Sequence, residues 1–151
     1  MPVWLKALLI IAIVAVMLIV GVIGAGYFWW VRNRDAFRTR GRETAAEGRE
    51  FGRNSDNSGC VDETFSRYKK GSPGFFNAIY YGNFMRACLE VSRPTPGFCD
   101  NVPAGKTKEL MTWLESQCQR YNVPNDQKCQ QLLMPEIMFC GVRKQDERNE
   151  N

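Results

Sequence analysis

A stretch of 25 residues near the amino terminus, from Ala7 to Val31, contains no charged residue and no proline. A helix rises about 1.5 Å per residue, so this stretch is roughly 37 Å long and exceeds the ~30 Å hydrocarbon core of a bilayer. A single tilted helix can therefore span the membrane. Aromatic residues flank it, as is typical of membrane–water interfaces: Trp4 on one side, and Tyr27, Phe28, Trp29 and Trp30 on the other. We predict a transmembrane signal-anchor over residues 1–31.

The same stretch has an alternative interpretation as a cleavable signal peptide. Lys6 would be its positive amino-terminal region, and Ile23-Gly24-Ala25 would be a poor cleavage site. Against this, the apolar run is longer than in most signal peptides and continues through aromatic residues into arginines, as a stop-transfer segment does. We therefore expect the anchor to stay uncleaved, with its flanks at the two surfaces of the lipid bilayer.

An arginine-rich segment follows, which we treat as a juxtamembrane linker over residues 32–59. Between Arg32 and Arg53 it has seven arginines and four acids, and two glycines make Thr44–Arg53 a marginal helix. From Asn54 onward twelve basic residues balance twelve acidic ones, which argues against binding to nucleic acid. The arginines are expected near lipid phosphates, and those at the membrane flank are Arg32, Arg34 and Arg38.

Six cysteines lie within about eighty residues of the distal part, and none lies in the apolar run; they are Cys60, Cys88, Cys99, Cys118, Cys129 and Cys140. An even number of cysteines in a small domain is typical of a disulfide framework in an oxidising compartment. The chain has no histidine and no Cys-x-x-Cys, so the spacing of zinc sites and of redox motifs is absent. We expect neither a metal nor a cofactor.

Two rules disagree on the side of the membrane that the distal part occupies. Basic flanks tend to remain in the cytoplasm, and the distal flank is the more basic one. Disulfides require the opposite side. We expect the disulfides to decide, with the amino terminus inside and the cysteine-rich domain in the periplasm or outside the cell. The alternative is a domain that faces the cytoplasm with free thiols.

The distal sequence predicts an all-α domain of about four helices over residues 60–142. Apolar residues recur at helical spacing in residues 60–70, 75–92, 106–121 and 127–140, and alternation typical of strands is not evident. Asn125 or Asp126 could cap the last helix, and Pro135 should kink or interrupt it. Arg93–Gly105 has three prolines and reads as a stiff loop, and residues 143–151 read as a disordered polar tail.

The hairpins suggest one pairing among the fifteen that six cysteines allow. In an antiparallel helix pair, residues equally distant from the turn lie opposite each other. Cys60 and Cys88 are about equally far from the turn near Pro73, and Cys118 and Cys129 flank the turn at Val123-Pro124. These two bridges leave Cys99 to pair with Cys140.

Protein binding is the function that this architecture favours, as a scaffold or accessory subunit of an envelope complex. Phe75, Tyr81 and Met85 fall off the face led by Phe76, and they form a candidate partner surface together with the loop residues Pro94, Pro96 and Phe98. In the anchor, Gly21 and Ala25 are four positions apart, a spacing that permits a homo-oligomer through close helix contact.

The sequence supports a catalytic function less well than it supports protein binding. Without histidine, a Ser-His or Cys-His nucleophile pair cannot form within the chain. The stretch Asn54–Gly59 resembles half of a calcium loop, but Phe65 stands where the bidentate glutamate belongs, so a capped turn is expected. A thiol-disulfide enzyme or another envelope enzyme remains the alternative function.

Overall fold

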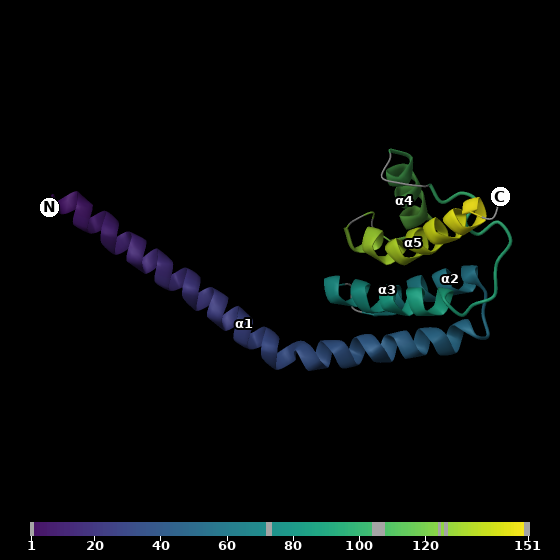
Figure 1. Cartoon of the computed structure of the whole chain (residues 1–151), viewed down its shortest axis with the longest axis horizontal. Helices are drawn as coiled ribbons and strands as arrows, with labels where there is room; N and C mark the ends of the chain where they lie inside the picture. The colour runs from purple at the N-terminus through teal and green to yellow at the C-terminus, as the bar shows by residue number, and fades with distance from the viewer. Residues whose placement is uncertain (1, 72–73, 104–107, 124, 126, 150–151) are drawn as a thin grey trace. The chain divides into compact units, whose positions relative to one another are not determined.

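The computed structural model describes residues 2–71, 74–103, 108–123, 125 and 127–149, without the side chains of residues 3, 5–7, 9 and 147 (Figure 1). Its elements are all helices, and no strand occurs in the described ranges: α1 (Val3–Gly52), α2 (Asn57–Lys70), α3 (Phe75–Leu89), α4 (Lys108–Arg120) and α5 (Gln127–Asn149). The predicted all-α class is confirmed, and α2 to α5 are the four helices expected in the distal part. The turn residues Pro73, Pro124 and Asp126 fall outside the described residues.

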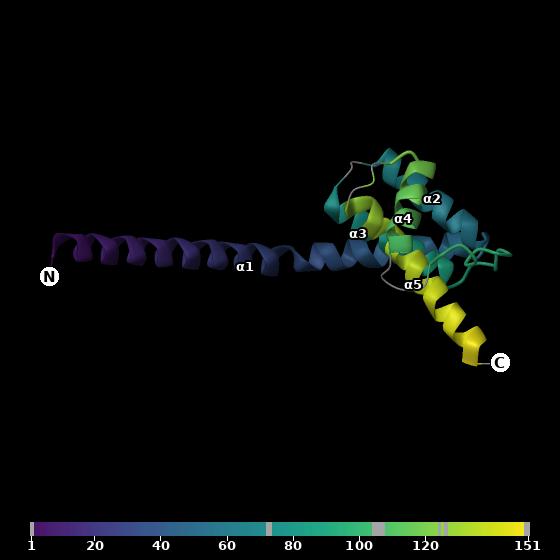
Figure 2. The same cartoon turned by 90° about the horizontal axis from the view of Figure 1, so that it is seen from above.

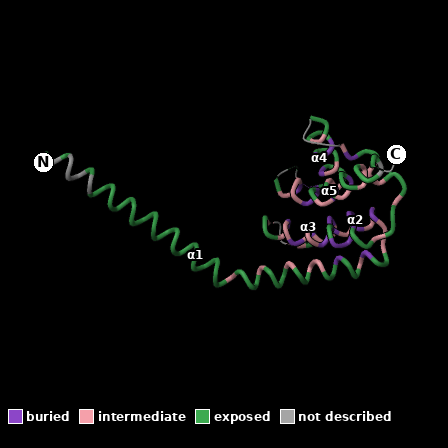
Figure 3. Tube along the Cα trace, viewed as in Figure 1, coloured by how far each residue is buried: buried purple, intermediate pink, exposed green. Residues whose placement is uncertain are grey.

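The chain divides into two units, residues 1–39 and residues 40–151, and α1 has its amino-terminal part in the first and its last turns in the second. In the first unit, residues 10–32 are all exposed, as Figure 3 shows by colour. A helix that is apolar on every side and buried against nothing is unstable in water. Among the described helices, α1 is the one long and apolar enough to cross a membrane.

The last turns of α1 pack in the second unit through glycines. A Cβ atom on Gly48 would overlap the backbone of Phe84, and one on Gly52 would lie 2.5 Å from the carbonyl oxygen of Cys88. These glycines therefore let the backbones of α1 and α3 approach closely. Residues 44–52 are helical, as the sequence weakly favoured, and packing against α3 stabilises a segment that is marginal by propensity alone.

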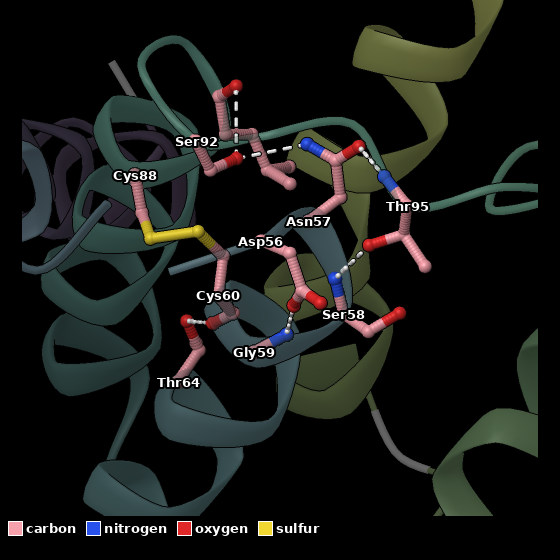
Figure 4. Close-up of a disulfide and its surroundings, with 10 residues drawn as sticks. Asp56, Asn57, Ser58, Gly59, Cys60, Thr64, Cys88, Ser92 and Thr95 are labelled. Atoms are coloured by element: carbon pink, nitrogen blue, oxygen red, sulfur yellow. Dashed lines mark hydrogen bonds between the residues drawn. A yellow bond between two sulfur atoms is a disulfide. The ribbon is translucent and has the colours of Figure 1, made fainter. Parts of the chain in front are cut away.

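Helix α2 starts at a side-chain cap beside the first disulfide (Figure 4). The carboxylate of Asp56 accepts a hydrogen bond of 2.8 Å from the backbone N–H of Gly59, which is the expected capped turn. Asn57 is buried; its side-chain amide donates to Ser92 Oγ at 2.8 Å, and its amide oxygen accepts from the backbone N–H of Thr95 at 3.0 Å. The start of α2 is thus joined to the loop that follows α3.

The turn between α4 and α5 has a clear local cause. Asn122 adopts a positive φ of 52°, and the N–H of Val123 donates to the carbonyl of Cys118 at 3.1 Å. This is the Schellman arrangement that ends a helix, with asparagine in the place usually taken by glycine. It reverses the chain so that α5 lies against α4.

Three disulfides hold the second unit, and they have the pairing that hairpin geometry predicts. Cys60 joins Cys88 between α2 and α3, Cys118 joins Cys129 between α4 and α5, and Cys99 joins Cys140. The last bridge ties the proline-rich loop to α5. Lys144 adds a second tie between the same segments, because its Nζ donates to the carbonyl of Val102 at 2.7 Å.

The core lies between α2, α3 and α5, with a contribution from α4. Its largest fully buried apolar side chains are Phe65, Phe84, Met85, Leu89, Leu132 and Leu133. Helix α5 continues through Pro135 to Asn149, so Pro135 does not interrupt it, and residues 143–149 of the predicted disordered tail are helical; residues 150–151 of that tail lie outside the described residues. Figure 2 shows the end of α5 extending past the other helices of the unit.

Candidate functional site

The structure separates the residues predicted to form a partner surface. Phe75 is exposed at the start of α3, whereas Pro94 and Pro96 are exposed in the loop after its end. Fifteen helical residues, about 22 Å, lie between the two places. Phe98 is half-buried and packs edge-on against Phe139, with 6.3 Å between ring centroids. These residues therefore do not form one continuous surface.

Two assignments within α3 are corrected. Met85 is 0% exposed and belongs to the core, so it cannot contribute to a surface. Phe76, expected to lead the buried face, is 49% exposed and packs edge-on against Phe75. Tyr81 is half-buried beside Tyr68. The reason is that α3 is covered by α2, α5 and the end of α1, so its buried surface is wider than the stripe of a one-sided helix.

The membrane-flank residues lie in the first unit. Trp4, Trp29 and Trp30 are exposed, and the rings of Trp29 and Trp30 lie about 6 Å from that of Phe37. The flank arginines Arg32, Arg34 and Arg38 are exposed as well. The structure does not describe the side chain of Lys6. In the proposed helix contact, Gly21 has open space around it and Ala25 is exposed.

An apolar groove runs between α3 and α5, and we call it the α3/α5 groove. Its volume is about 420 Å³. The α5 side presents Met134, Met138 and Val142, which are 48%, 64% and 61% exposed and are spaced four residues apart on one face of the helix. The remaining lining residues are Ala78, Ile79, Gly82, Asn83, Arg86, Leu89, Glu90, Gln131, Pro135, Phe139 and Arg143.

Backbone chemistry explains the shape of this groove. Gly82 has no side chain, and a Cβ atom there would lie 3.9 Å from both the carbonyl oxygen of Gln131 and the ring of Pro135. Pro135 has no N–H, so it cannot donate to the carbonyl of Gln131 one turn earlier. The side-chain oxygen of Gln131 is also buried without a hydrogen-bond partner. The missing side chain of Gly82 therefore leaves space opposite Gln131 and Pro135.

A second concavity, which we call the polar cavity, lies among the loop after α3, the start of α2, and helices α4 and α5. Its volume is about 230 Å³. It is lined by Ser58, Thr95, Pro96, Gly97, Phe98, Asn101, Val102, Trp113, Gln117, Arg120 and Glu136.

Glu136 is the buried charge of the polar cavity. It is 6% exposed, and its Oε2 has no hydrogen-bond partner. Burial raises the pKa of its carboxyl to about 7; the charge of Arg120 lowers the pKa and that of Asp62 raises it further. Near neutral pH this group is therefore divided between its protonated and ionised forms.

Two other groups have pKa values shifted by the fold. Tyr121 stacks on Phe65 with 4.0 Å between ring centroids and donates to Asp62 at 2.7 Å; burial and then this carboxylate raise the pKa of its hydroxyl. Arg67 is ion-paired to Glu63 at 2.8 Å and to Glu47 at 2.6 Å. Burial lowers the pKa of Arg67, but the hydrogen bonds to these two carboxylates raise it overall. Both groups join helices and do not face the groove or the polar cavity.

The cysteines are shielded from solvent. All are buried except Cys99, which is half-buried, and all six are in disulfides. The described residues include no group of three or more acidic or cysteine side chains placed to hold a metal ion. The asparagine- and serine-rich turn before α2 instead uses its carboxylate, Asp56, to cap the helix.

The groove was not predicted from the sequence, although the sequence contains a signal for it. Met134, Met138 and Val142 recur every four residues, off the face that carries Cys129, Leu132 and Leu133. Comparison of the chain with models of protein families, with curated proteins and with solved structures finds no match, so the features that bear on function are those of its own residues.

Proposed function

We propose that this protein is a single-span membrane protein whose cysteine-rich domain lies outside the cytoplasm and works by binding a helix of another protein. The observation that carries the proposal is the α3/α5 groove, an exposed apolar concavity on a domain that three disulfides hold together. Exposed apolar concavities of this size are typical of binding sites.

The anchor and the disulfides support the location. The apolar part of α1 has no protein surface to cover it in the first unit, and a bilayer would provide one. The three disulfides favour an oxidising compartment for the second unit. The flank arginines favour the opposite orientation, but a few charges give only a bias in topology. Reduction of the bridges, by contrast, would remove the covalent cross-links that a domain with a small core depends on.

The chemistry of the groove supports an amphipathic helix as its occupant. Methionine side chains are flexible and adapt to apolar faces of different shapes, and such grooves typically receive helices with apolar residues at every third or fourth position. Two arginines and one glutamate line the groove beside its apolar residues: Arg86, Arg143 and Glu90. With their net positive charge, we expect acidic residues beside the apolar stripe of the partner.

The alternative function, thiol-disulfide exchange, requires a bridge that a thiolate can reach. Five of the six cysteines are buried at 0–1% exposure, and only Cys99 is half-buried. This favours a structural role for the bridges.

The location is tested by alkylating membranes with a thiol reagent without prior reduction, followed by intact mass measurement. The proposal expects no labelled cysteine. One labelled pair would support the exchange enzyme, and six labelled cysteines would support a domain that faces the cytoplasm. Protease added outside intact cells, or to spheroplasts if there is an outer membrane, should remove the second unit without lysis.

The groove is tested by photo-crosslinking from position 138 in intact membranes, with position 115 on α4 as the matched control. We expect a crosslink to a different protein from position 138 and none from position 115, because Glu115 is exposed and lies outside the groove. Met134→Glu should abolish the crosslink by placing a charge in the apolar contact. Crosslinks only between copies of this chain, or no crosslink at all, would contradict the proposed partner.

A further inference from the structure

The start of α3 exposes a pair of aromatic side chains. Phe75 and Phe76 are 48% and 49% exposed and pack edge-on against each other. In the described part of residues 40–151, every other aromatic side chain is buried or half-buried. Apolar residues exposed singly are common, but two adjacent rings form an apolar patch whose exposure to water is unfavourable. The patch therefore indicates a surface that something apolar covers.

Two exposed lysines end the helix before this pair. Lys69 and Lys70 are the last residues of α2, and only four residues separate Lys70 from Phe75. A chain of that length spans at most about 18 Å, so the lysines and the rings belong to the same end of the domain. A Cβ atom on Gly71 would lie 2.9 Å from the hydroxyl of Tyr81, which places the end of α2 against the second turn of α3.

Arg40 adds a third basic group at this end. Its guanidinium lies 5.3 Å from the centre of the Tyr80 ring, and it lines a concavity of about 380 Å³ together with Lys70. The other charged residues that line this concavity, or pair with one that does, are Glu43, Glu47, Glu63 and Arg67. With Lys69 these are four basic and three acidic groups, and Arg67 is paired with two of the acids. The balance is positive by one charge, which favours an anionic partner.

The last turns of α1 show which end of the domain this is (Figure 1). Gly48 of α1 approaches the backbone of Phe84, and one turn later Gly52 approaches that of Cys88, so this part of α1 runs parallel to α3. The start of α3 therefore lies at the end of the second unit where the chain arrives from the apolar run.

The anchor keeps this end close to lipid. Nine positions separate Val31, the last residue of the apolar run, from Arg40. Such a segment spans about 14 Å as a helix and at most about 32 Å when fully extended. The proposed function places the apolar run in a bilayer, so this end of the domain is tethered within a short distance of the lipid surface. A short tether makes contact with that surface intramolecular and therefore favourable even when the contact is weak.

We propose that the start of α3 is a membrane-docking surface. Phe75 and Phe76 enter the interfacial region of the bilayer that holds α1, and the two lysines at the end of α2 bind its phosphates. Aromatic rings favour this region, and lysine side chains can lie along apolar surface while their ammonium groups stay among polar headgroups. The docking surface rests on the membrane anchor of the proposed function, but it is independent of the α3/α5 groove and of the side of the membrane on which the domain lies.

The test is photo-crosslinking of the full chain reconstituted into vesicles of equimolar phosphatidylcholine and phosphatidylglycerol. The photoreactive residue p-benzoylphenylalanine replaces Phe75 or Phe76, which it resembles in shape, and mass spectrometry identifies lipid adducts. Met111 is the matched control position, because it is 54% exposed and lies on α4, which packs against α5. Leu18, inside the apolar run, reports insertion of the anchor. We expect lipid adducts from positions 18, 75 and 76, and several-fold fewer from position 111.

Charge reversal tests the lysines. The double substitution Lys69→Glu/Lys70→Glu should lower the adduct yield from position 75 about fivefold or more in the mixed vesicles, because each lysine near an anionic surface contributes to the attraction. The decrease should be smaller in vesicles of phosphatidylcholine alone. Lys108→Glu reverses the charge of an exposed lysine at the start of α4 and should leave the yield unchanged. Near-ultraviolet circular dichroism of each variant checks that the domain is folded.

The outcomes separate this docking surface from the anchor on which it rests. No lipid adduct from position 18 would overturn the anchor and the docking surface with it. Adducts from position 18 without adducts from positions 75 and 76, or equal yields from positions 75 and 111, would overturn the docking surface alone. Adducts from position 75 to a second copy of the chain in place of lipid would also overturn it, because the patch would then be a protein interface. None of these results depends on a crosslink in the α3/α5 groove.

Discussion

At Glu136, a single carboxyl makes the free energy of unfolding depend on pH. Its pKa is about 7 in the folded chain against an ordinary value of 4.5, because burial disfavours its charge. Below about pH 4.5 the group is protonated in both states and carries no penalty. As pH rises from there through 7, the unfolded chain loses its proton first, so stability falls, and the full penalty is present above pH 7.

Glu136→Gln should therefore stabilise the domain at pH 8 by about 3 kcal/mol, since each pKa unit corresponds to about 1.4 kcal/mol. At pH 4 the substitution should have little effect. Urea titration of the full chain in detergent, followed by near-ultraviolet circular dichroism with the disulfides intact, measures both values. An equal effect at pH 4 and pH 8 would mean that folding does not raise the pKa of this carboxyl.

Asn57 is a second residue whose contribution is local and measurable. It is 1% exposed, and both its amide donor and its amide acceptor are used across thirty-five or more residues of sequence. Asn57→Leu should destabilise the domain by about 2–4 kcal/mol, because Ser92 Oγ and the N–H of Thr95, both half-buried, lose a hydrogen-bond partner. Ser58→Ala, next to it on the half-buried side, is the control and should change stability by less than about 1 kcal/mol.

Individual residues were harder to place from the sequence than the helices that carry them. A capped turn before α2 was expected from the sequence because such a turn is set by neighbours within a few residues, and the structure identifies Asp56 as its cap. Met85 and Phe76 were assigned to the wrong faces, because burial on α3 depends on helices distant in sequence. Glu136 lies in a helix whose polar and apolar residues gave no sign of a cavity, because the cavity is also lined by residues of the proline-rich loop, α2 and α4.

How the helices pair depends mainly on the turns between neighbours in the sequence. Much of the pairing of the helices was therefore predictable. Equal spacing from a turn brought Cys118 opposite Cys129 and Cys60 opposite Cys88. The extent of α1 to Gly52 was not predictable from propensity, because glycine is a poor helix former unless a neighbour needs its lack of side chain. Nor did Pro135 interrupt α5, which packs against α3.

Glycines in the last turns of α1 provide a test of that packing. Gly48→Ala places a Cβ atom onto the backbone of α3 and should destabilise the domain by about 1–3 kcal/mol. Gly41→Ala is the matched control, because its Cβ atom would meet only the side chain of Asn83 at 3.6 Å and should gain up to about 1 kcal/mol of helix propensity. Urea titration of the two variants should move in opposite directions; two similar shifts would contradict the close contact of α1 with α3.

The disulfides should differ in their contributions because they close loops of different length. Removing Cys99–Cys140, which spans 41 positions, should cost about 4 kcal/mol, and removing Cys118–Cys129, which spans 11, about 3 kcal/mol. Paired alanine substitutions, followed by thermal unfolding in detergent, give the order. The reverse order would mean that local packing at the α4–α5 turn outweighs chain entropy.

At the scale of the whole molecule, the two units have different requirements for their surroundings. Residues 1–39 have an exposed apolar helix, and residues 40–151 have a core with three disulfides. We expect a chain without residues 1–39 to be soluble when made in an oxidising compartment, and to lose most of its soluble yield when made in a reducing cytoplasm. Gel filtration and thiol counting of the two products measure this. Equal yields with six free thiols in the cytoplasmic product would show that the bridges are dispensable.

The positions of the bridges along the chain influence the order in which they can form during biosynthesis. Cys60 and Cys88 emerge before any later cysteine, so their bridge can close first, whereas Cys99–Cys140 encloses Cys118–Cys129. As the chain emerges, Cys118 becomes available to Cys99 before Cys140 does, and a bridge between Cys99 and Cys118 would be non-native. Maturation of this domain therefore calls for an isomerase that reshuffles sulfur pairs, or for a helix α4 that folds soon enough to keep Cys118 out of reach until Cys129 arrives.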